Sequence, residues 1–284
     1  MHDFLTLTLM GTGSSGGVPR VGNVWGNCDP DEPRNRRRRC SLLIEREAEK
    51  LEDELQENLT NRTTVVIDTG ADLREQLLTS DVKSIEGVVL THSHADHIFG
   101  LDDLRQMAVN LRRPIDVWID DATRTQVMAA FGYCFLQAPG SSYPAFCTEH
   151  TLTPCTPLII DGPGGAIQIN TLVAEHGDIN ALGIRVGNAV YLPDMKRITH
   201  PKSIELLSGI DTLIVDALRY NQHPSHMNVD ESLEFIECVK PERAILTNMH
   251  GDLDYHKLKS SLPDGVEPGY DGLKIKLQTS NLTT

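Results

Sequence analysis

The stretch "THSHADH", residues 91–97, holds three histidines and an aspartate in a chain with only 11 histidines among 284 residues. It directly follows the apolar run "GVVL" (87–90), which predicts a loop between a strand and a helix. Neutral imidazole nitrogens and a carboxylate are suitable ligands for zinc, manganese or iron. Solubility does not require such a run, and a packed core would not tolerate it, so the stretch predicts a metal site.

The spacing favours two ions over one. A short loop cannot wrap four ligand-type side chains round a single tetrahedral centre. Two adjacent ions could share them, with His92 and His94 on one ion and Asp96 and His97 on the other. The alternative, a polar loop with fortuitous histidines, fits a lone histidine better than it fits this run.

Further ligand candidates stand at the ends of three strand-like runs. These are His176 after "INTLVAE", Asp194 after "AVYLP" and His250 after "AILTNM". Strand ends that converge on one edge are where α/β sheets place their sites. One carboxylate can bridge two ions, and Asp194 is the predicted bridge.

The rest of the chain alternates strand-like and helix-like runs, which predicts sheets with helices outside. No repeat or Pro- or Ser-rich linker is evident, so residues 1–284 are predicted to form a single domain. The strand-like runs are 4–11, 40–46, 63–70, 85–92, 114–120, 166–176, 182–194, 211–218, 242–250 and 273–279. The helix-like runs are 71–80, 100–113, 122–133, 201–209 and 228–240, the last opening with a capping box of Asn228 and Glu231. The segment 45–62 is dense in Glu and Lys and is predicted to be an acidic surface insertion, a helix or a solvated hairpin tip.

Composition limits the partners. Asp and Glu number 40 against 26 Lys and Arg, which gives a net charge of −14. Such a chain repels bulk nucleic acid and anionic membrane, so an anionic substrate needs local positive charge from metal ions or arginines. No signal peptide or membrane-spanning stretch is apparent. Six scattered cysteines without a CxxC pair favour a reducing cytoplasm.

The motif and the order of His176, Asp194 and His250 after it resemble the metallo-β-lactamase superfamily over nearly the whole chain. The turn "GTGSSGGVP" (11–19) and the strand "VVIDTG" (65–70) fit the same resemblance. It implies an α/β fold, an αββα four-layer sandwich with two mixed sheets face to face, helices outside and a dinuclear metal site at one edge.

The resemblance also implies a role for each candidate residue. His92, His94 and His176 would hold the first ion, and Asp96, His97 and His250 the second, with Asp194 bridging and Asp68 as a supporting aspartate. Asp68 would accept the free N–H of a ligating histidine and so fix its orientation and basicity. His and Asp ligands accept Zn²⁺, Mn²⁺ or Fe, so the native metal stays open.

The run 213–237 resembles the phosphodiesterase branch of this superfamily, especially phosphoribosyl cyclic phosphodiesterases and, more distantly, transfer-RNA 3′-processing nucleases. In that branch a histidine matching His226 lies over the metals and donates a proton to the leaving oxygen, and Asp216 could orient it. His223 is a weaker alternative. A metal-bridged hydroxide would attack phosphorus. The expected function is hydrolysis of a small phosphodiester, cyclic or nucleotide-like.

Two departures from the branch favour a small substrate. Of the cysteine cluster that holds a separate structural zinc in those phosphodiesterases, only Cys28 remains, so no second site is predicted. The arm with which transfer-RNA-processing relatives grip RNA is not evident, and the acidic insertion would repel RNA. Double-stranded nucleic acid and membrane are not expected partners. A homodimer is an open expectation, because dimers are the commonest oligomers of soluble proteins.

Two loops leave alternatives open. Five arginines in "RNRRRRCS" (34–41) could grip a terminal phosphate, or they could form a solvated loop or a salt-bridge cluster with the acidic insertion. "GTGSSGG" lacks the Lys-Ser/Thr ending of a phosphate-binding P-loop. It is read as a tight turn whose glycines let the backbone approach the site, with Ser14 and Ser15 as weak substrate contacts.

Two other functions compete with a phosphodiesterase. The same metals could hydrolyse a thioester or lactone, in which case the His226–Asp216 pair would be surplus. A non-catalytic, metal-bound ligand-binding protein is the other alternative, although a complete ligand set with open coordination positions favours catalysis.

Overall fold

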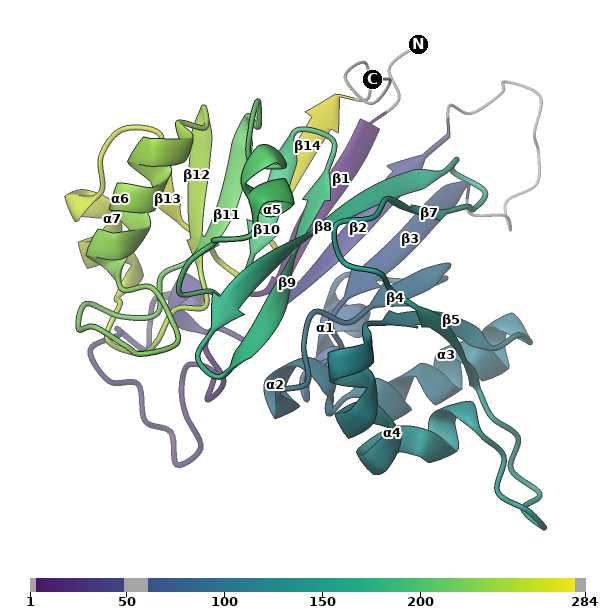
Figure 1. Cartoon of the computed structure of the whole chain (residues 1–284). Helices are drawn as coiled ribbons and strands as arrows, with labels where there is room; N and C mark the ends of the chain where they lie inside the picture. The colour runs from purple at the N-terminus through teal and green to yellow at the C-terminus, as the bar shows by residue number, and fades with distance from the viewer. Residues whose placement is uncertain (1–3, 49–60, 279–284) are drawn as a thin grey trace, which may run out of the picture.

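The computed structural model describes residues 4–48 and 61–278. Two seven-stranded sheets lie face to face, and helices cover the outer face of each (Figure 1). This arrangement confirms the predicted αββα sandwich.

The first sheet has the strand order β14-β1-β2-β3-β4-β5-β6. Its first four strands pair antiparallel, and β3 to β6 pair parallel. The strands are β1 (Phe4–Gly11), β2 (Ser41–Glu47), β3 (Arg62–Ile67), β4 (Gly87–Val89), β5 (Ile115–Ile119), β6 (Cys147–Thr151) and β14 (Lys274–Gln278). The helices of this half are α1 (Leu73–Thr79), α2 (Ala95–Ile98), α3 (Leu104–Leu111) and α4 (Asp121–Phe135), with a 3₁₀ turn at Leu101–Asp103.

The second sheet has the order β13-β12-β11-β10-β9-β8-β7 and repeats the same plan. β7 to β10 pair antiparallel, and β10 to β13 pair parallel. The strands are β7 (Leu158–Ile160), β8 (Ile167–His176), β9 (Ile179–Val186), β10 (Ala189–Leu192), β11 (Thr212–Asp216), β12 (Arg243–Thr247) and β13 (Val266–Pro268). The helices are α5 (Pro201–Glu205), α6 (Val229–Val239) and α7 (Tyr255–Ser261), and a further 3₁₀ turn spans Pro33–Asn35.

Three apolar layers hold the sandwich together. The first lies between the sheets and includes Leu7, Ile67, Ile184 and Ile245. The second joins the first sheet to its helices, and the third joins the second sheet to α5–α7. Parallel strands that are covered on both faces read as continuous apolar runs, which is why "GVVL" and "TLIVD" have no polar alternation.

The parallel strands bring the functional residues to one edge. β3 and β4 in the first sheet, and β10, β11 and β12 in the second, all end at this edge, and the candidate ligands follow those ends. The backbone of Gly13 forms bridges to both Arg39 and Met249 there, so the "GTGSSGG" turn fastens the two halves beside the site.

Most predicted elements are present, with two kinds of difference. The run 182–194 is two antiparallel strands, β9 and β10, because residues 187–188 form a turn with Gly187 at a positive φ of 57°. The short strands β6, β7 and β13 and the helices α2 and α7 were not predicted, because their sequences are short or mixed in polarity. Asp96 and His97 therefore lie in a short helix where a loop was predicted. The capping box at Asn228 and Glu231 is confirmed.

Several predictions remain open. Most of the acidic insertion lies outside the described residues, but its ends, 45–47 and 62, are strand residues of β2 and β3. The single domain stays a prediction that the shared inter-sheet core supports.

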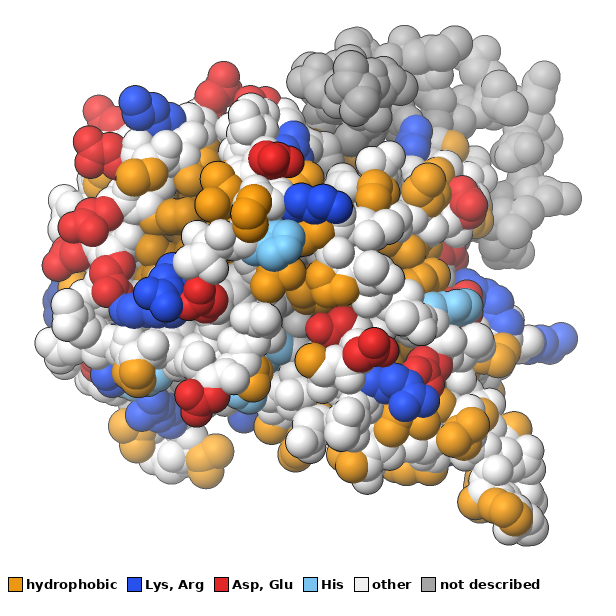
Figure 2. Space-filling model, viewed as in Figure 1, with side chains coloured by type: hydrophobic (Ala, Val, Ile, Leu, Met, Phe, Trp, Pro, Cys, Tyr) orange, Lys and Arg blue, Asp and Glu red, His pale blue; other side chains and the backbone are white. Residues whose placement is uncertain are grey.

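No described helix is long and apolar enough to cross a membrane. Figure 2 shows acidic and basic side chains interspersed on one face without a continuous basic field. The cytoplasmic location and the homodimer stay predictions.

The cap of α6 gives a stability test. Asn228 Oδ1 accepts the Glu231 N–H at 2.8 Å, and Asn228 Nδ2 donates to the Tyr220 carbonyl oxygen at 3.0 Å. We expect Asn228→Ala to lower the free energy of unfolding by about 1 kcal/mol, because a helix cap is lost. Urea unfolding would measure this. Glu237→Ala, an exposed change on the same helix, should stay within about 0.5 kcal/mol of the native protein. Equal losses in both variants would contradict the role of the cap.

Candidate metal centre

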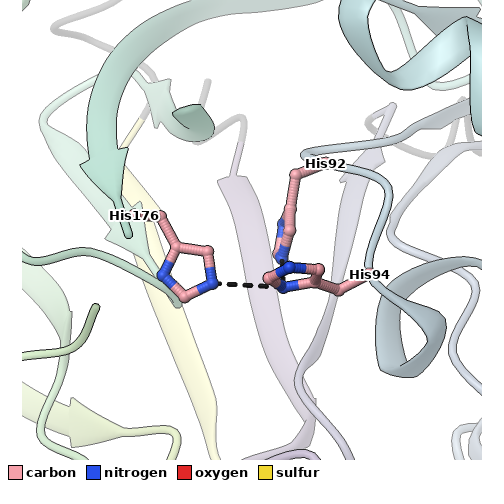
Figure 3. A group of neighbouring side chains, drawn as sticks. All are labelled: His92, His94 and His176. Carbon is pink, nitrogen blue, oxygen red and sulfur yellow. Dashed lines mark hydrogen bonds between the residues drawn. The ribbon is translucent and has the colours of Figure 1, made fainter. Parts of the chain in front are cut away.

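Three imidazole nitrogens converge at the shared edge of the sheets (Figure 3). His94 Nδ1 lies 3.1 Å from His92 Nε2 and 3.2 Å from His176 Nε2. His92 and His94 come from the loop between β4 and α2, and His176 is the last residue of β8. Ligand atoms about 2.0–2.1 Å from a tetrahedral zinc ion lie about 3.3 Å apart. Both distances match this spacing, and all three nitrogens lie within 4.8 Å of one another, as a group that could hold one divalent ion.

Hydrogen bonds behind the rings fix which nitrogen is free. His176 Nδ1 donates to the Ser225 carbonyl oxygen at 2.8 Å. His92 Nδ1 donates to Thr91 Oγ1 at 3.0 Å, because the hydroxyl proton of Thr91 goes to Asp68 Oδ2 at 2.8 Å. In both rings the unprotonated Nε2 therefore faces the other histidines, which is the tautomer that binds a metal.

A second close contact joins His97 and Asp194. Asp194 Oδ2 is buried and has no hydrogen-bond partner among the described residues, although His97 Nε2 lies 2.7 Å away. His97 Nδ1 donates to Asp68 Oδ2 at 2.7 Å, so the lone pair of Nε2 faces a carboxylate oxygen. Burial opposes a charged ring, but Asp194 and Asp68 raise the pKa of His97 well above its ordinary value. A second proton relieves the repulsion between the two acceptors, and a divalent ion can replace that proton.

The charges of the other donors suit a cation. Burial holds the pKa of His92 well below its ordinary value and lowers the pKa of His176. Burial would raise the pKa of Asp194, but His97, His92 and His226 hold it well below the usual range. Neutral imidazoles and an ionised carboxylate are the forms in which these groups bind divalent metals.

The described residues form three groups whose ligand atoms lie within 4.8 Å of one another. They are His92, His94 and His176; His92, His97 and Asp194; and His176, Asp194 and His226. Asp194, His92 and His176 each belong to two of the groups, so the bridging role of Asp194 stays a prediction. Five of the seven predicted ligands are included, and Asp96 and His250 are not.

Asp96 and His250 lie close by. Asp96 Oδ2 is 3.5 Å from His97 Nε2. His250 lines a cavity together with Asp96 and Asp194, and the Nδ1 of His250 accepts the backbone N–H of Asp252 at 3.2 Å. Its Nε2 is therefore the nitrogen left to bind an ion. Neither residue belongs to a ligand group of the structure, so their role as ligands of the second ion stays a prediction.

Asp68 orients His97 through an unusual backbone. Asp68 follows β3 with φ at 65°, in the left-handed region that Asp tolerates better than most residues. Its Oδ1 accepts the Thr91 N–H at 2.8 Å, which fixes the carboxylate toward His97. A Cβ at Gly70 would lie 2.1 Å from the Asp96 carbonyl oxygen, so only glycine lets the end of β3 pack against α2.

His226 and Asp216 form a close pair beside the ligand groups. His226 Nδ1 donates to Asp216 Oδ2 at 2.7 Å, and Asp216 also accepts the Met195 N–H at 3.1 Å. Burial raises the pKa of Asp216. Burial disfavours a charged His226 ring, but Asp216 and Asp194 raise the pKa of His226. With Nδ1 committed, Nε2 is the atom of His226 that can exchange a proton.

Asn248 links the two parts of the site and was missed at the sequence level. Its Nδ2 donates to Asp194 Oδ1 at 2.8 Å and to Asp216 Oδ1 at 3.1 Å. Asn248 follows β12 with φ at 59°, which turns its side chain inward. A polar residue directly after the apolar run "AILT" was the only available signal.

A cavity of about 420 Å³ opens over these residues. His94, His176, Asp194, His226 and His250 line it. Ser14 and Ser15 line it too, in agreement with the prediction that the glycine-rich turn approaches the site. Its lining also includes two arginines that were not predicted, Arg20 and Arg219.

The arginine run 34–39 does not reach this cavity. Arg37 is buried and donates to the His250 carbonyl oxygen at 3.4 Å, and Arg36 packs over the Trp25 ring at 5.4 Å. The other three form ion pairs: Arg34–Glu32, Arg38–Asp271 and Arg39–Asp72. The structure therefore favours the salt-bridge alternative over phosphate binding, with partners other than the acidic insertion among the described residues.

A family comparison agrees with the fold and the site. Residues 63–249 match the family model of the β-lactamase superfamily domain, and the chain belongs to the metallo-β-lactamase superfamily. Within it, the crystal structure of a diphosphatase from the PhnP family is 30% identical. That match covers 98% of this chain and 99% of the other, with a TM-score of 0.80, and it places the chain in the PhnP family.

Two further relatives are similar over about half of their own length. An octanoyltransferase of Porphyromonas gingivalis is 31% identical over 274 residues, which are 94% of this chain and 50% of that protein. A ribonuclease Z of Methanococcus maripaludis is 25% identical over 165 residues, 52% of each protein. The superfamily is hydrolytic, and the His/Asp cluster is suited to divalent metal ions.

The support that Asp68 gives to His97 can be tested by metal affinity. We expect Asp68→Asn to lower Zn²⁺ affinity by about 10- to 100-fold. The neutral amide accepts the hydrogen bond from the His97 N–H more weakly than the charged carboxylate does. Competition with a chelating indicator would measure it. Asp116→Asn removes a similar carboxylate–histidine pair, 2.8 Å from His150 and outside the cavity, and serves as the control. The same loss in both variants would refute the assignment.

Proposed function

We propose that the protein is a dinuclear-metal-dependent hydrolase that cleaves a small phosphodiester, cyclic or nucleotide-like. The observation that carries the proposal is the His226–Asp216 pair, in which His226 lines the same cavity as His94, His176 and Asp194. A general acid beside a pair of metal sites is what cleavage of a phosphate ester with a poor leaving group requires.

The proposed ligands form two sets, one for each metal ion. His92, His94 and His176 would hold one ion, and Asp96, His97 and His250 the other, with Asp194 shared. Bound there, two Zn²⁺ or Mn²⁺ ions would supply an activated water and neutralise charge on phosphoryl oxygens. Asp68, Thr91 and Ser225 keep the ligating rings oriented through their outer hydrogen bonds.

His226 is the proposed general acid. Its Nδ1 is held by Asp216, so Nε2 would deliver the proton to the leaving oxygen. Asp216 and Asp194 raise the pKa of His226 against the effect of burial, which favours the protonated ring that a general acid needs. Asn248 donates to both Asp194 and Asp216 and so fixes the distance between the metal ligands and the acid.

The comparisons and the cavity support a small phosphate-containing substrate. The PhnP-family relative is a diphosphatase, which favours a phosphoanhydride bond as a second candidate for the bond cleaved. A cavity of about 420 Å³ is within the range of small-molecule sites. Structured RNA, the substrate class suggested by the name of the ribonuclease Z relative, is not favoured for a chain of charge −14.

Acyl chemistry is the alternative that a specific observation favours. The octanoyltransferase relative is 31% identical, but the match covers half of that protein, and its activity can belong to the other half. A thioester or lactone hydrolase would not need the His226–Asp216 pair. A non-catalytic protein would bind a phosphate ester without turnover.

Hydrolysis rates separate these functions. They would be measured with Zn²⁺ or Mn²⁺ for bis(p-nitrophenyl) phosphate, 2′,3′-cyclic nucleotides, symmetrical dinucleoside diphosphates and an octanoyl thioester. Asp194→Ala should abolish every metal-dependent rate, and retained activity in this variant would refute the site.

The acid role predicts a dependence on the leaving group. His226→Gln should lower kcat by about 10²- to 10⁴-fold for a 2′,3′-cyclic nucleotide, whose alkoxide needs a proton. The loss should be much smaller for bis(p-nitrophenyl) phosphate, because p-nitrophenolate leaves unprotonated. His223→Gln is the matched control and should affect both substrates alike. Equal losses for His226→Gln on the two substrates would exclude it as the acid.

The same role predicts a pH dependence. Because the acid must carry its proton, kcat for the cyclic substrate should fall as pH rises through the pKa of His226. Asp216 raises that pKa, so Asp216→Asn should move the fall in kcat to lower pH. A pH–rate profile that does not move would show that Asp216 does not act through His226.

A further inference from the structure

The loop that carries His250 is held in place by a distant segment of the chain. This loop, residues 250–255, lies between β12 and α7, and the segment that contacts it, residues 26–37, follows the glycine-rich turn. The backbone N–H of Asn27 donates to the Gly251 carbonyl oxygen at 2.7 Å. We call these two parts of the chain the His250 loop and the clamp segment.

Side chains of the clamp segment hold the far end of the His250 loop. Asn35 Nδ2 donates to Asp254 Oδ2 at 2.7 Å, and Asn35 Oδ1 accepts the Tyr255 N–H at 2.8 Å. Cys28 Sγ donates to the Leu253 carbonyl oxygen at 3.4 Å. The path of the loop is therefore fixed by hydrogen bonds at several points.

Arg37 lies at the buried centre of these contacts. Its side chain is only 2% exposed. Arg37 Nη1 donates to the His250 carbonyl oxygen at 3.4 Å and to Cys28 Sγ at 3.8 Å, and Nη2 donates to Asn35 Oδ1 at 3.3 Å. One guanidinium thus connects two side chains of the clamp segment with the main chain of a proposed metal ligand.

The guanidinium of Arg37 has an unusual environment for a buried charge. Its acceptors are a carbonyl oxygen, a thiol and an amide, and its Nε has no hydrogen-bond partner among the described residues. Burying a cation without a carboxylate partner is costly. A methionine would fill much of the same space without a charge, so packing alone does not account for an arginine. The forked donors, which reach three acceptors at once, do account for it.

The backbone of Arg37 also holds the glycine-rich turn. The Arg37 N–H donates to the Val18 carbonyl oxygen at 2.8 Å, and the Val18 N–H donates to the Arg37 carbonyl oxygen at 2.9 Å. A Cβ at Gly13 would lie 2.8 Å from Arg37 Cβ, so the turn packs directly against this side chain. Arg37 therefore joins the glycine-rich turn to the His250 loop, and both contribute residues to the lining of the cavity.

We propose that Arg37 is a positioning residue for His250, and thereby for the second metal ion. The inference rests on the proposed function, in which His250 is a ligand of that ion. Arg37 would contact neither the ion nor the substrate. It would fix the main chain at His250, whose side chain lines the cavity, and so limit the positions that the imidazole can take.

Titration of the metal-free full chain with Zn²⁺ against chelating indicators tests this role. The native protein should bind two ions, and His250→Ala should weaken the binding of one of them. Arg37→Met, which keeps most of the volume and removes the donors, should weaken the same ion by about tenfold or more and leave the other unchanged. Arg37→Lys, which keeps the charge and one donor group, should restore part of the lost affinity.

A double-mutant cycle shows whether Arg37 acts through His250. If it does, Arg37→Met should change Zn²⁺ affinity by no more than about twofold in the His250→Ala background, because the ligand that Arg37 positions is then missing. Equal losses in the native and the His250→Ala backgrounds would overturn the proposal. If Arg37→Met does not fold, Arg37→Lys decides, and native affinity for both ions in that variant would count against the proposal.

Arg185→Met is the matched control. Arg185 is a half-buried arginine that donates to the carbonyl oxygens of Gly187, Leu206 and Ser208, and it does not line the cavity. Both variants lose such hydrogen bonds and should unfold at lower urea concentrations, but only Arg37→Met should lose Zn²⁺ affinity. An equal loss of affinity in Arg185→Met would reveal a general effect of lower stability and rule out the specific role.

Failure of this inference and failure of the proposed function give different results. If the native protein binds two ions, and His250→Ala weakens one while neither Arg37 variant weakens either, the two-ion site stands and the role of Arg37 falls. If the native protein binds a single ion and His250→Ala leaves it unchanged, the two-ion site of the proposed function falls, and the role of Arg37 with it.

Discussion

The site depends on the outer hydrogen bonds of its buried histidines. Thr91, Ser225 and Asp68 accept the Nδ1 protons of His92, His176 and His97, respectively, so that each Nε2 lone pair faces the inside of the site. Several acceptors and the Asp194 carboxylate then converge in a small buried volume. Such an arrangement is unfavourable without positive charge between the groups. The outer partners thus impose the need for a cation, and they do so through backbone and side-chain atoms that never contact it.

The topology explains why these atoms meet. Each half of the chain forms antiparallel strands and then parallel strands, and parallel strands end at the same edge. The apolar interiors of β3, β4, β10, β11 and β12 fix those ends by packing on both faces. The polar residues that follow have little freedom left. Asp68 and Asn248 occupy the left-handed region directly after β3 and β12, a strained conformation that the packed strands and the hydrogen bonds of the site stabilise.

The parts of the site that were predictable from sequence are those with a local signature. "THSHADH" is such a signature, and His176, Asp194 and His250 follow apolar runs that mark strand ends. Asn248 gives only a faint signal of this kind, and the Ser225 carbonyl gives none, because any residue has a carbonyl oxygen. Arg20 and Arg219 could not be found because the paths of their loops depend on tertiary contacts. The arginine run 34–39 left its two alternatives open for the same reason, since its acidic partners at Asp72 and Asp271 are distant in sequence.

Charge is distributed in a way that favours small anions over large ones. A net charge of −14 opposes a polyanion, whose phosphates would extend over the acidic surface. At about 0.15 M ionic strength, exposed charges more than about 8 Å away are largely screened, so a small ligand inside the cavity responds mainly to nearby groups. Those groups include Arg20 and Arg219, which line the cavity, and divalent ions would add further positive charge. On the proposed function, such a protein would bind a compact phosphate ester locally while it repels nucleic acid at longer range. This balance is a physical basis for selecting substrates by size as well as by chemistry.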